Sequence, residues 1–290
     1  MNIIDYFVNY SFVRYAVIVG VLISLCSSLL GVTLVLKRYS YIGDGLSHVA
    51  FGGLAIASAL NFTNNLYIVM PVTVLVAVIL IGTDKKGRGD SSLAMVSAAS
   101  MALGYLIFNK FPQAGGNVSG DVCTSLFGST AILTLNSNDV TLCLIMAILV
   151  LLFFVFFYNR IFAITFDETF AYATGVKTKL YKFLIAVICG VVISISMRLV
   201  GSLLVSALIV FPAMSAMKVF KSFRSVMICS GIISVIIAFL GFSASVSFET
   251  PVGATIVAGE VLVFLVFSLA ALVLNKVHEK QTHNSHRNIK

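Results

Sequence analysis

The chain has 290 residues, of which 59% are apolar and only 10% are charged. A soluble domain carries about 25% charged residues and a disordered chain is poor in apolar ones, so both classes are excluded. The net charge of +8 comes from Lys and Arg that stand between apolar runs, a pattern that indicates membrane topology and not a nucleic-acid partner.

The apolar runs are long and continuous, which predicts membrane-spanning helices and not the alternating segments of a β-barrel. We expect an all-α, polytopic bundle of eight or nine transmembrane helices that forms one domain over residues 1–275, followed by a polar, mobile tail over 276–290. Residues 183–199 and 200–218 could be two crossings, or one long helix and a half-crossing. The expected crossings are 14–36, 42–60, 66–82, 91–109, 139–160, 183–199, 200–218, 226–247 and 252–275.

The basic residues predict the orientation of the bundle. With the N-terminus outside and the C-terminus in the cytoplasm, all 19 Lys and Arg except Arg14, Lys110 and Arg198 fall on the inner side. This distribution satisfies the positive-inside rule, and the reverse orientation violates it.

Two connections are longer than a turn requires. Residues 110–138 lie outside in this orientation and could include a short re-entrant helix around Cys123 to Leu133. Residues 161–182 lie inside and are expected to form an amphipathic cytoplasmic helix.

Asp44 and His48 are the most informative ionisable pair. They are four residues apart at the start of the second predicted crossing, so a helix places them on one face. An acid within a membrane segment is costly and usually functional. A carboxylate and an imidazole suit zinc, manganese or iron, and two copies in a symmetric dimer would supply four ligands, as tetrahedral zinc prefers. The alternative is that Asp44 caps the helix while His48 packs against a neighbour.

The other ionisable residues give weaker indications. Glu260 lies within the last crossing, where it could line an ion path or form a hydrogen bond inside the bundle. Glu249 lies near the outer mouth, where it could guide cations or simply be solvated. The remaining histidines lie in the polar tail, at His278, His283 and His286.

Four stretches are informative together, namely residues 43–53 (GDGLSHVAFGG), 166–176, 200–213 and 250–257. In this order they resemble the ABC-3 family of bacterial zinc, manganese and iron ABC importer permeases. Residues 43–53 are similar to its GD-x-L-S/A-H motif. Residues 166–176 resemble its cytoplasmic segment, residues 200–213 its V-G-x-L-L-V-x-A-L-L-x-x-P-A stretch, and residues 250–257 its P-x-G-x-T-I-V stretch. The resemblance spans roughly residues 12–275.

This resemblance implies a BtuC-like type II importer permease in the bacterial cell membrane. It implies a homodimer with two cytoplasmic ATPase subunits and an extracytoplasmic metal-binding protein, and it implies that Asp44 and His48 contact the ion in transit. Manganese-type relatives often carry Pro shortly after the His. The corresponding position here is Gly52 or a neighbour, which favours zinc as the transported ion.

ATP hydrolysis requires a separate subunit, because residues 82–89 lack the final Lys-Ser/Thr of a Walker A motif. A cytoplasmic helix over 165–176 could bind in a cleft of that ATPase, with Phe166 and Phe170 as anchors, or it could lie on lipid headgroups. The predicted coupling residues are Phe166, Asp167, Glu168, Phe170, Ala171 and Gly175.

The sequence therefore predicts a transport permease, with no enzymatic activity and no resident cofactor, that imports Zn²⁺, or alternatively Mn²⁺ or Fe²⁺. An ion-coupled secondary transporter is the alternative from another class, but it would need more intramembrane acids than Asp44 and Glu260. A membrane metalloenzyme is disfavoured because His48 is the only imidazole outside the tail.

Overall fold

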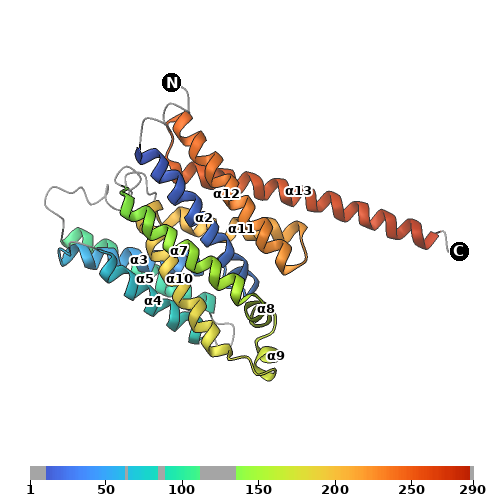
Figure 1. The fold of residues 1–290 in the computed structure, drawn as a ribbon, viewed down its shortest axis with the longest axis horizontal. Helices are drawn as coiled ribbons and strands as arrows, with labels where there is room; N and C mark the ends of the chain where they lie inside the picture. Colours follow the sequence, from blue (N-terminus) through green and yellow to red (C-terminus); the bar gives the residue numbers. More distant parts are fainter. Residues whose placement is uncertain (1–10, 63–64, 84–88, 112–134, 288–290) are drawn as a thin grey trace.

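The computed structural model describes residues 11–62, 65–83, 89–111 and 135–287, and every regular element in these ranges is an α-helix (Figure 1). The predicted all-helical architecture is confirmed. The helices are α2 (Ser11–Leu36), α3 (Ile42–Ala59), α4 (Leu66–Thr83), α5 (Gly89–Lys110), α7 (Ser137–Phe156), α8 (Tyr158–Phe166), α9 (Glu168–Ala173), α10 (Thr178–Val200), α11 (Ser202–Val219), α12 (Phe223–Phe248) and α13 (Val252–Arg287).

Each of the nine predicted crossings corresponds to one long helix. Within the described residues, seven helices are long and apolar enough to cross a membrane, namely α2, α5, α7, α10, α11, α12 and α13. The apolar part of α4 is shorter, Leu66–Gly82. The ninth, α3, contains the polar pair Asp44 and His48.

Residues 183–199 and 200–218 form two helices, α10 and α11. A single residue, Gly201, separates them with φ 95° and ψ 156°. Only glycine adopts this backbone conformation without strain, so the glycine ends α10 and lets α11 start in a new direction.

The expected single helix over 161–182 is wrong. The segment divides into α8 and α9, and α10 already begins at Thr178. Asp167 adopts an extended conformation between α8 and α9, and its carboxylate accepts a hydrogen bond from the Phe170 N–H at 2.9 Å. An aspartate that caps a new helix in this way necessarily ends the previous one. Gly175, with φ 82°, then ends α9.

The helix of the last crossing extends into the predicted polar tail, since α13 continues to Arg287 and projects beyond the bundle (Figure 1). Extending an existing helix needs no new nucleus, and Lys, Glu and Gln in this stretch are good helix formers. The proposed re-entrant helix around Cys123 to Leu133 lies outside the described residues.

The bundle is organised around α2, which packs against α7, α11 and α12. Serine hydroxyls join α12 to α2: Ser234 donates to the carbonyl of Ser24 at 2.9 Å, and Ser230 donates to the carbonyl of Ser28 at 3.5 Å. Small residues that form interhelical hydrogen bonds are typical of helix contacts in membranes. On the other side of the bundle, α3, α4 and α5 lie together (Figure 1).

Candidate metal site and coupling segment

Asp44 and His48 lie one turn apart on the same face of α3, as predicted. The Nε2 atom of His48 is 3.5 Å from Oδ1 of Asp44, and their side chains are 16% and 52% exposed, respectively. This separation exceeds the usual N–H···O distance of about 2.7–3.2 Å. A tetrahedral ion with bonds of about 2.0–2.2 Å holds two ligand atoms about 3.3–3.6 Å apart, so the pair is spaced like an edge of a metal site.

Asp44 does not cap α3. The N-cap position is Tyr41, which makes no side-chain capping bond, and Asp44 lies within the first helical turn. There the positive end of the helix dipole favours a carboxylate without using its oxygens for capping. The carboxylate oxygens are therefore not taken up by the backbone N–H groups at the start of α3.

Asp44, but not His48, lines a pocket of about 310 Å³ between α3 and α5. Asp44 contributes a carboxylate to its wall, and Ser97 contributes a hydroxyl. A hydrated divalent ion needs this kind of partly polar space, and an apolar site could not replace its water. The pocket is lined by Tyr41, Asp44, Gly45, Leu93, Ala94, Ser97, Ala98 and Met101.

Glycines on three sides of α3 allow the neighbouring helices to approach the pair closely. A Cβ at Gly45 would lie 3.2 Å from the Leu93 side chain of α5, and a Cβ at Gly53 would lie 3.3 Å from the Val69 backbone of α4. A Cβ at Gly43 would meet the side chain of Ile209 in α11. The glycine-rich sequence thus inserts α3 between α4, α5 and α11.

Ser206 of α11 is a residue that the sequence did not single out. It lies beside the Asp44 carboxylate, and its hydroxyl donates to the Ser202 carbonyl at 3.0 Å. Nothing in the spacing of Ser206 and Asp44, which are 162 positions apart in the sequence, predicts their proximity.

One protomer supplies an incomplete ligand set. Across the part of the chain that the structure describes, no three His, Cys, Asp or Glu side chains gather at one place. In the same part, His48 Nδ1 is buried without a hydrogen-bond partner. Among the described residues, Asp44 and His48 are therefore not joined by a third His, Cys, Asp or Glu.

The structure does not bring Glu260 or Glu249 to this pair. Glu260 is fully buried on α13, and neither of its carboxyl oxygens has a hydrogen-bond partner among the described residues. Because α13 packs on α11 and α12 while α3 packs on the other side of α11, a helix lies between Glu260 and Asp44. Glu249 is the exposed C-cap of α12, in the left-handed conformation.

The predicted coupling segment lies at one end of the bundle, where α8 and α9 meet (Figure 1). Phe166 and Phe170 are 58% and 64% exposed, so both could enter a groove on another protein. Ala171 is buried beside Ile164 and Val176 and presents nothing outward. Glu168 turns towards two lysines, Lys37 and Lys182.

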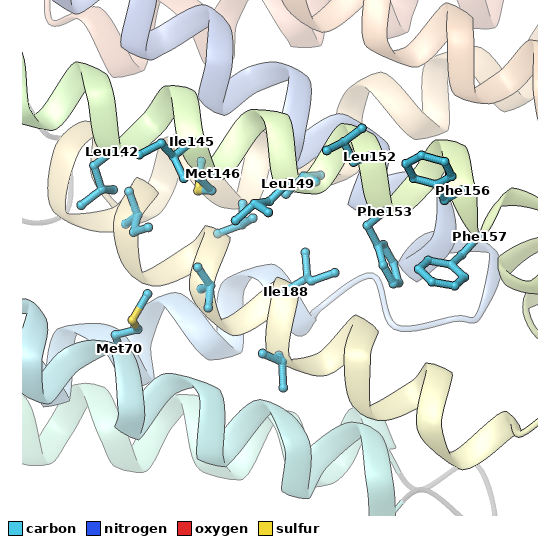
Figure 2. A pocket seen from close by; sticks show the side chains of 15 residues that line it. Met70, Leu142, Ile145, Met146, Leu149, Leu152, Phe153, Phe156, Phe157 and Ile188 are labelled. Atoms are coloured by element: carbon cyan, nitrogen blue, oxygen red, sulfur yellow. The ribbon is translucent and has the colours of Figure 1, made fainter.

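An apolar groove between α7 and α10 offers no alternative metal site. Leu142, Leu149 and Phe156 follow one side of α7, and Ile188 of α10 and Met70 of α4 lie opposite (Figure 2). The groove has a volume of about 640 Å³ and its lining contains no charged or hydroxyl side chain. Such a surface suits hydrocarbon and not a divalent ion.

The chain matches known transport proteins over most of its length. The model of the "ABC 3 transport family" matches residues 9–271. A "Probable metal transport system membrane protein" of Thermotoga maritima is 30% identical over 86% of this chain and 86% of that protein. "Manganese import system permease protein ScaB" of Streptococcus gordonii is 28% identical, covering 89% and 91%. "High-affinity zinc uptake system membrane protein ZnuB" of Haemophilus influenzae is 26% identical, covering 86% and 94%.

The fold is similar to that of a solved permease. The structure titled "PsaBC from Streptococcus pneumoniae in complex with Fab" aligns with a TM-score of 0.79 and 25% identity, and it covers 91% of this chain and 94% of that chain. This similarity confirms the predicted type II importer architecture. Permeases of this kind are transport components, and ATP hydrolysis belongs to a separate subunit. The chain therefore belongs to the ABC 3 transport family, as the multi-pass membrane permease of a metal importer.

Proposed function

We propose that the chain is the membrane subunit of an ATP-driven importer that moves Zn²⁺ into the bacterial cytoplasm, with Asp44 and His48 as ligands of the ion in transit. The observation that carries the proposal is the 3.5 Å separation of a carboxylate oxygen and an imidazole nitrogen, with the carboxylate at the wall of a partly polar pocket. The relatives named above include manganese and zinc systems. An imidazole nitrogen beside a carboxylate favours zinc, because manganese prefers oxygen ligands.

A homodimer would complete the site. Asp44 is half exposed in the isolated protomer, and two copies facing each other would offer two carboxylates and two imidazoles. Four such ligands satisfy the tetrahedral preference of zinc, and separating the protomers would release the ion without breaking either protomer.

The proposed orientation places the N-terminus outside and α8 and α9 in the cytoplasm. The connections at the α8–α9 end carry most of the Lys and Arg, as the positive-inside rule requires of the cytoplasmic side. The cytoplasmic ATPase subunits would then bind the exposed rings of Phe166 and Phe170, and a metal-binding protein would deliver the ion at the opposite end.

Metal-specific uptake by the reconstituted complex tests the function. Asp44→Ala and His48→Ala should each reduce Zn²⁺ uptake to near the ATP-free background, whereas His283→Ala, which removes a tail imidazole, should leave it unchanged. Mn²⁺ and Fe²⁺ are assayed in parallel. Normal transport of all three metals by both pair variants would overturn the site, and uptake driven by a proton gradient without ATP would indicate a secondary transporter.

Binding of the ATPase subunit tests the coupling segment separately. Replacing both Phe166 and Phe170 with Ala should reduce co-purification of the ATPase. Phe248→Ala is the matched control, because this phenylalanine is 76% exposed at the far end of α12. Unchanged ATPase binding in the double variant would assign α8 and α9 to the lipid surface instead.

A further inference from the structure

Glu168 joins three parts of the chain through two lysines. Lys182 of α10 donates to Oε1 of Glu168 at 3.0 Å, and Nζ of Lys37, the residue after α2, lies 3.8 Å from Oε2. The two lysine side chains are only 11% and 14% exposed, whereas that of Glu168 is 44% exposed. One carboxylate on α9 thus balances two largely buried ammonium groups, an arrangement called here the Glu168 bridge.

On one side, the Glu168 bridge reaches the metal pair through a tight backbone turn. Tyr39 N–H donates to Leu34 O at 2.9 Å, and Ile42 N–H donates to Tyr39 O at 3.1 Å. Tyr39 is itself buried, and Arg38 adopts the left-handed conformation that closes such a turn. Lys37 is therefore connected to α3, and to Asp44 within its first turn, by a chain segment with little freedom.

On the other side, α9 has few apolar contacts that could hold it in place. It is six residues long, and its one buried residue, Ala171, belongs to a small cluster with Ile164 and Val176 that is separate from the main core. A space of about 700 Å³ lies beside it, between α4, α9 and α10. The Glu168 bridge is thus a principal attachment of α9 to α2 and α10, and α9 has room to move.

We propose that Glu168 is a positioning residue that transmits a displacement of α9 to the α2–α3 turn and so to Asp44 and His48. The inference rests on the proposed function, in which α8 and α9 bind the ATPase. Removing the carboxylate leaves the two largely buried amines with no acid between them, so Lys37 and Lys182 no longer hold α9 and the displacement is no longer transmitted. Glu168 itself touches neither the ion nor nucleotide.

Uptake of Zn²⁺ per ATP hydrolysed, measured in the reconstituted complex with its ATPase and binding protein, separates transmission from simple stability. Glu168→Gln should lower this ratio about tenfold while the complex still assembles and hydrolyses ATP, a size consistent with loss of a partly buried ion pair. Asp139→Asn is the matched control, because Asp139 lies 3.9 Å from Arg198 at the opposite end of α10. The exchange Glu168→Lys with Lys182→Glu reverses the charges of the 3.0 Å pair, so this ion pair can form again and should restore part of the ratio.

A reporter beside the metal pair provides a second measurement that does not depend on the identity of the ion. The chain contains no tryptophan, and Tyr41 lines the pocket next to Asp44. In a Tyr41→Trp chain, nucleotide binding to the ATPase should change the tryptophan emission, relative to the complex without this substitution. Adding Glu168→Gln should abolish the change.

The outcomes distinguish this inference from the proposed function. A normal uptake ratio and a normal emission change in Glu168→Gln would overturn the inference alone, as would an equal fall in uptake and hydrolysis. If Asp44→Ala and His48→Ala took up the metals as fast as the wild-type complex, the proposed function would be overturned. The emission change would still decide whether Glu168 transmits motion. If Glu168→Gln fails to assemble, Lys37→Gln and Lys182→Gln are measured identically, and normal values in both overturn the inference.

Discussion

Gly31 of α2 lies against the backbone carbonyl of Ile209 in α11, with no space between them for a side chain. The side chain of Ile209 also faces Gly43 of α3. The helices α2, α3 and α11 therefore meet at Ile209. Its contact on α3, Gly43, is the residue before Asp44. Close backbone contact at small residues is the main source of helix association in membranes, where lipid removes the hydrophobic driving force.

Gly31→Ala should therefore destabilise the bundle, because its Cβ would overlap backbone atoms that cannot rotate away. We expect a loss of about 1–3 kcal/mol in the free energy of unfolding, the usual cost of overpacking. Thermal denaturation in detergent measures this loss. Gly20→Ala on the same helix is the control, because its Cβ would meet nothing within 4 Å. Equal stability of the two variants would contradict the packing described.

Gly201→Ala should destabilise the junction between α10 and α11. At φ 95° and ψ 156° a side chain is strained, at a cost of about 1–3 kcal/mol. Gly231→Ala provides the comparison, since its Cβ would make an ordinary 3.4 Å contact with Leu25. Compared with the unsubstituted chain, Gly201→Ala should unfold at a lower midpoint concentration of urea, and Gly231→Ala should not. Equal midpoints for the two variants would argue against the strained conformation.

The sequence predicts the helices far better than their ends. Long apolar runs predict the nine long helices, because a membrane-spanning segment must form its backbone hydrogen bonds internally. The division of residues 161–182 was mispredicted because Asp167 is both an interior residue of an amphipathic pattern and a good cap. The continuation of α13 to Arg287 was not predicted because the last crossing was ended where its apolar run ends, although a helix can extend into a polar stretch without a new nucleus.

His48→Asp should change which metal is preferred. It replaces the only nitrogen ligand of the proposed pair with an oxygen, and oxygen ligands suit Mn²⁺ better than Zn²⁺. We expect Zn²⁺ uptake to fall about tenfold or more while Mn²⁺ uptake falls less. Competition between the two ions in the same vesicles measures the ratio. A parallel decline of both ions would show that His48 does not select the metal.

Lys37 should make the stability of the bundle depend on pH. Burial lowers the pKa of its ammonium from 10.5 to about 8, with Lys182 acting in the same direction and Glu168 opposing it. Between about pH 8 and 10.5 the unfolded chain holds this proton and the folded chain does not, so the free energy of unfolding should rise with pH. Lys37→Met should remove this rise, as a pH series of denaturation curves would show. A difference between the two proteins that stays constant across this range would contradict the shifted pKa.

Local spacing identifies the site only in part. Asp44 and His48 share a helix face because they are four residues apart, and this was predictable. Ser206, Lys37 and Lys182 were not, because their partners lie on other helices and a single sequence contains no information on those contacts. For the same reason the sequence did not predict that Glu168, one of the expected coupling residues, pairs with Lys37 and Lys182.

The junction at Gly201 has a mechanical consequence. With one residue between them, α10 and α11 have no slack, so neither helix can slide along its axis without displacing the end of the other. Lys182 lies near the start of α10, and Ser206 lies in α11 beside the carboxylate of Asp44. The two residues are therefore connected through Gly201. A displacement of Gly201 by α10 therefore also displaces the first turn of α11, which would give the Glu168 bridge a second connection to the proposed ion site.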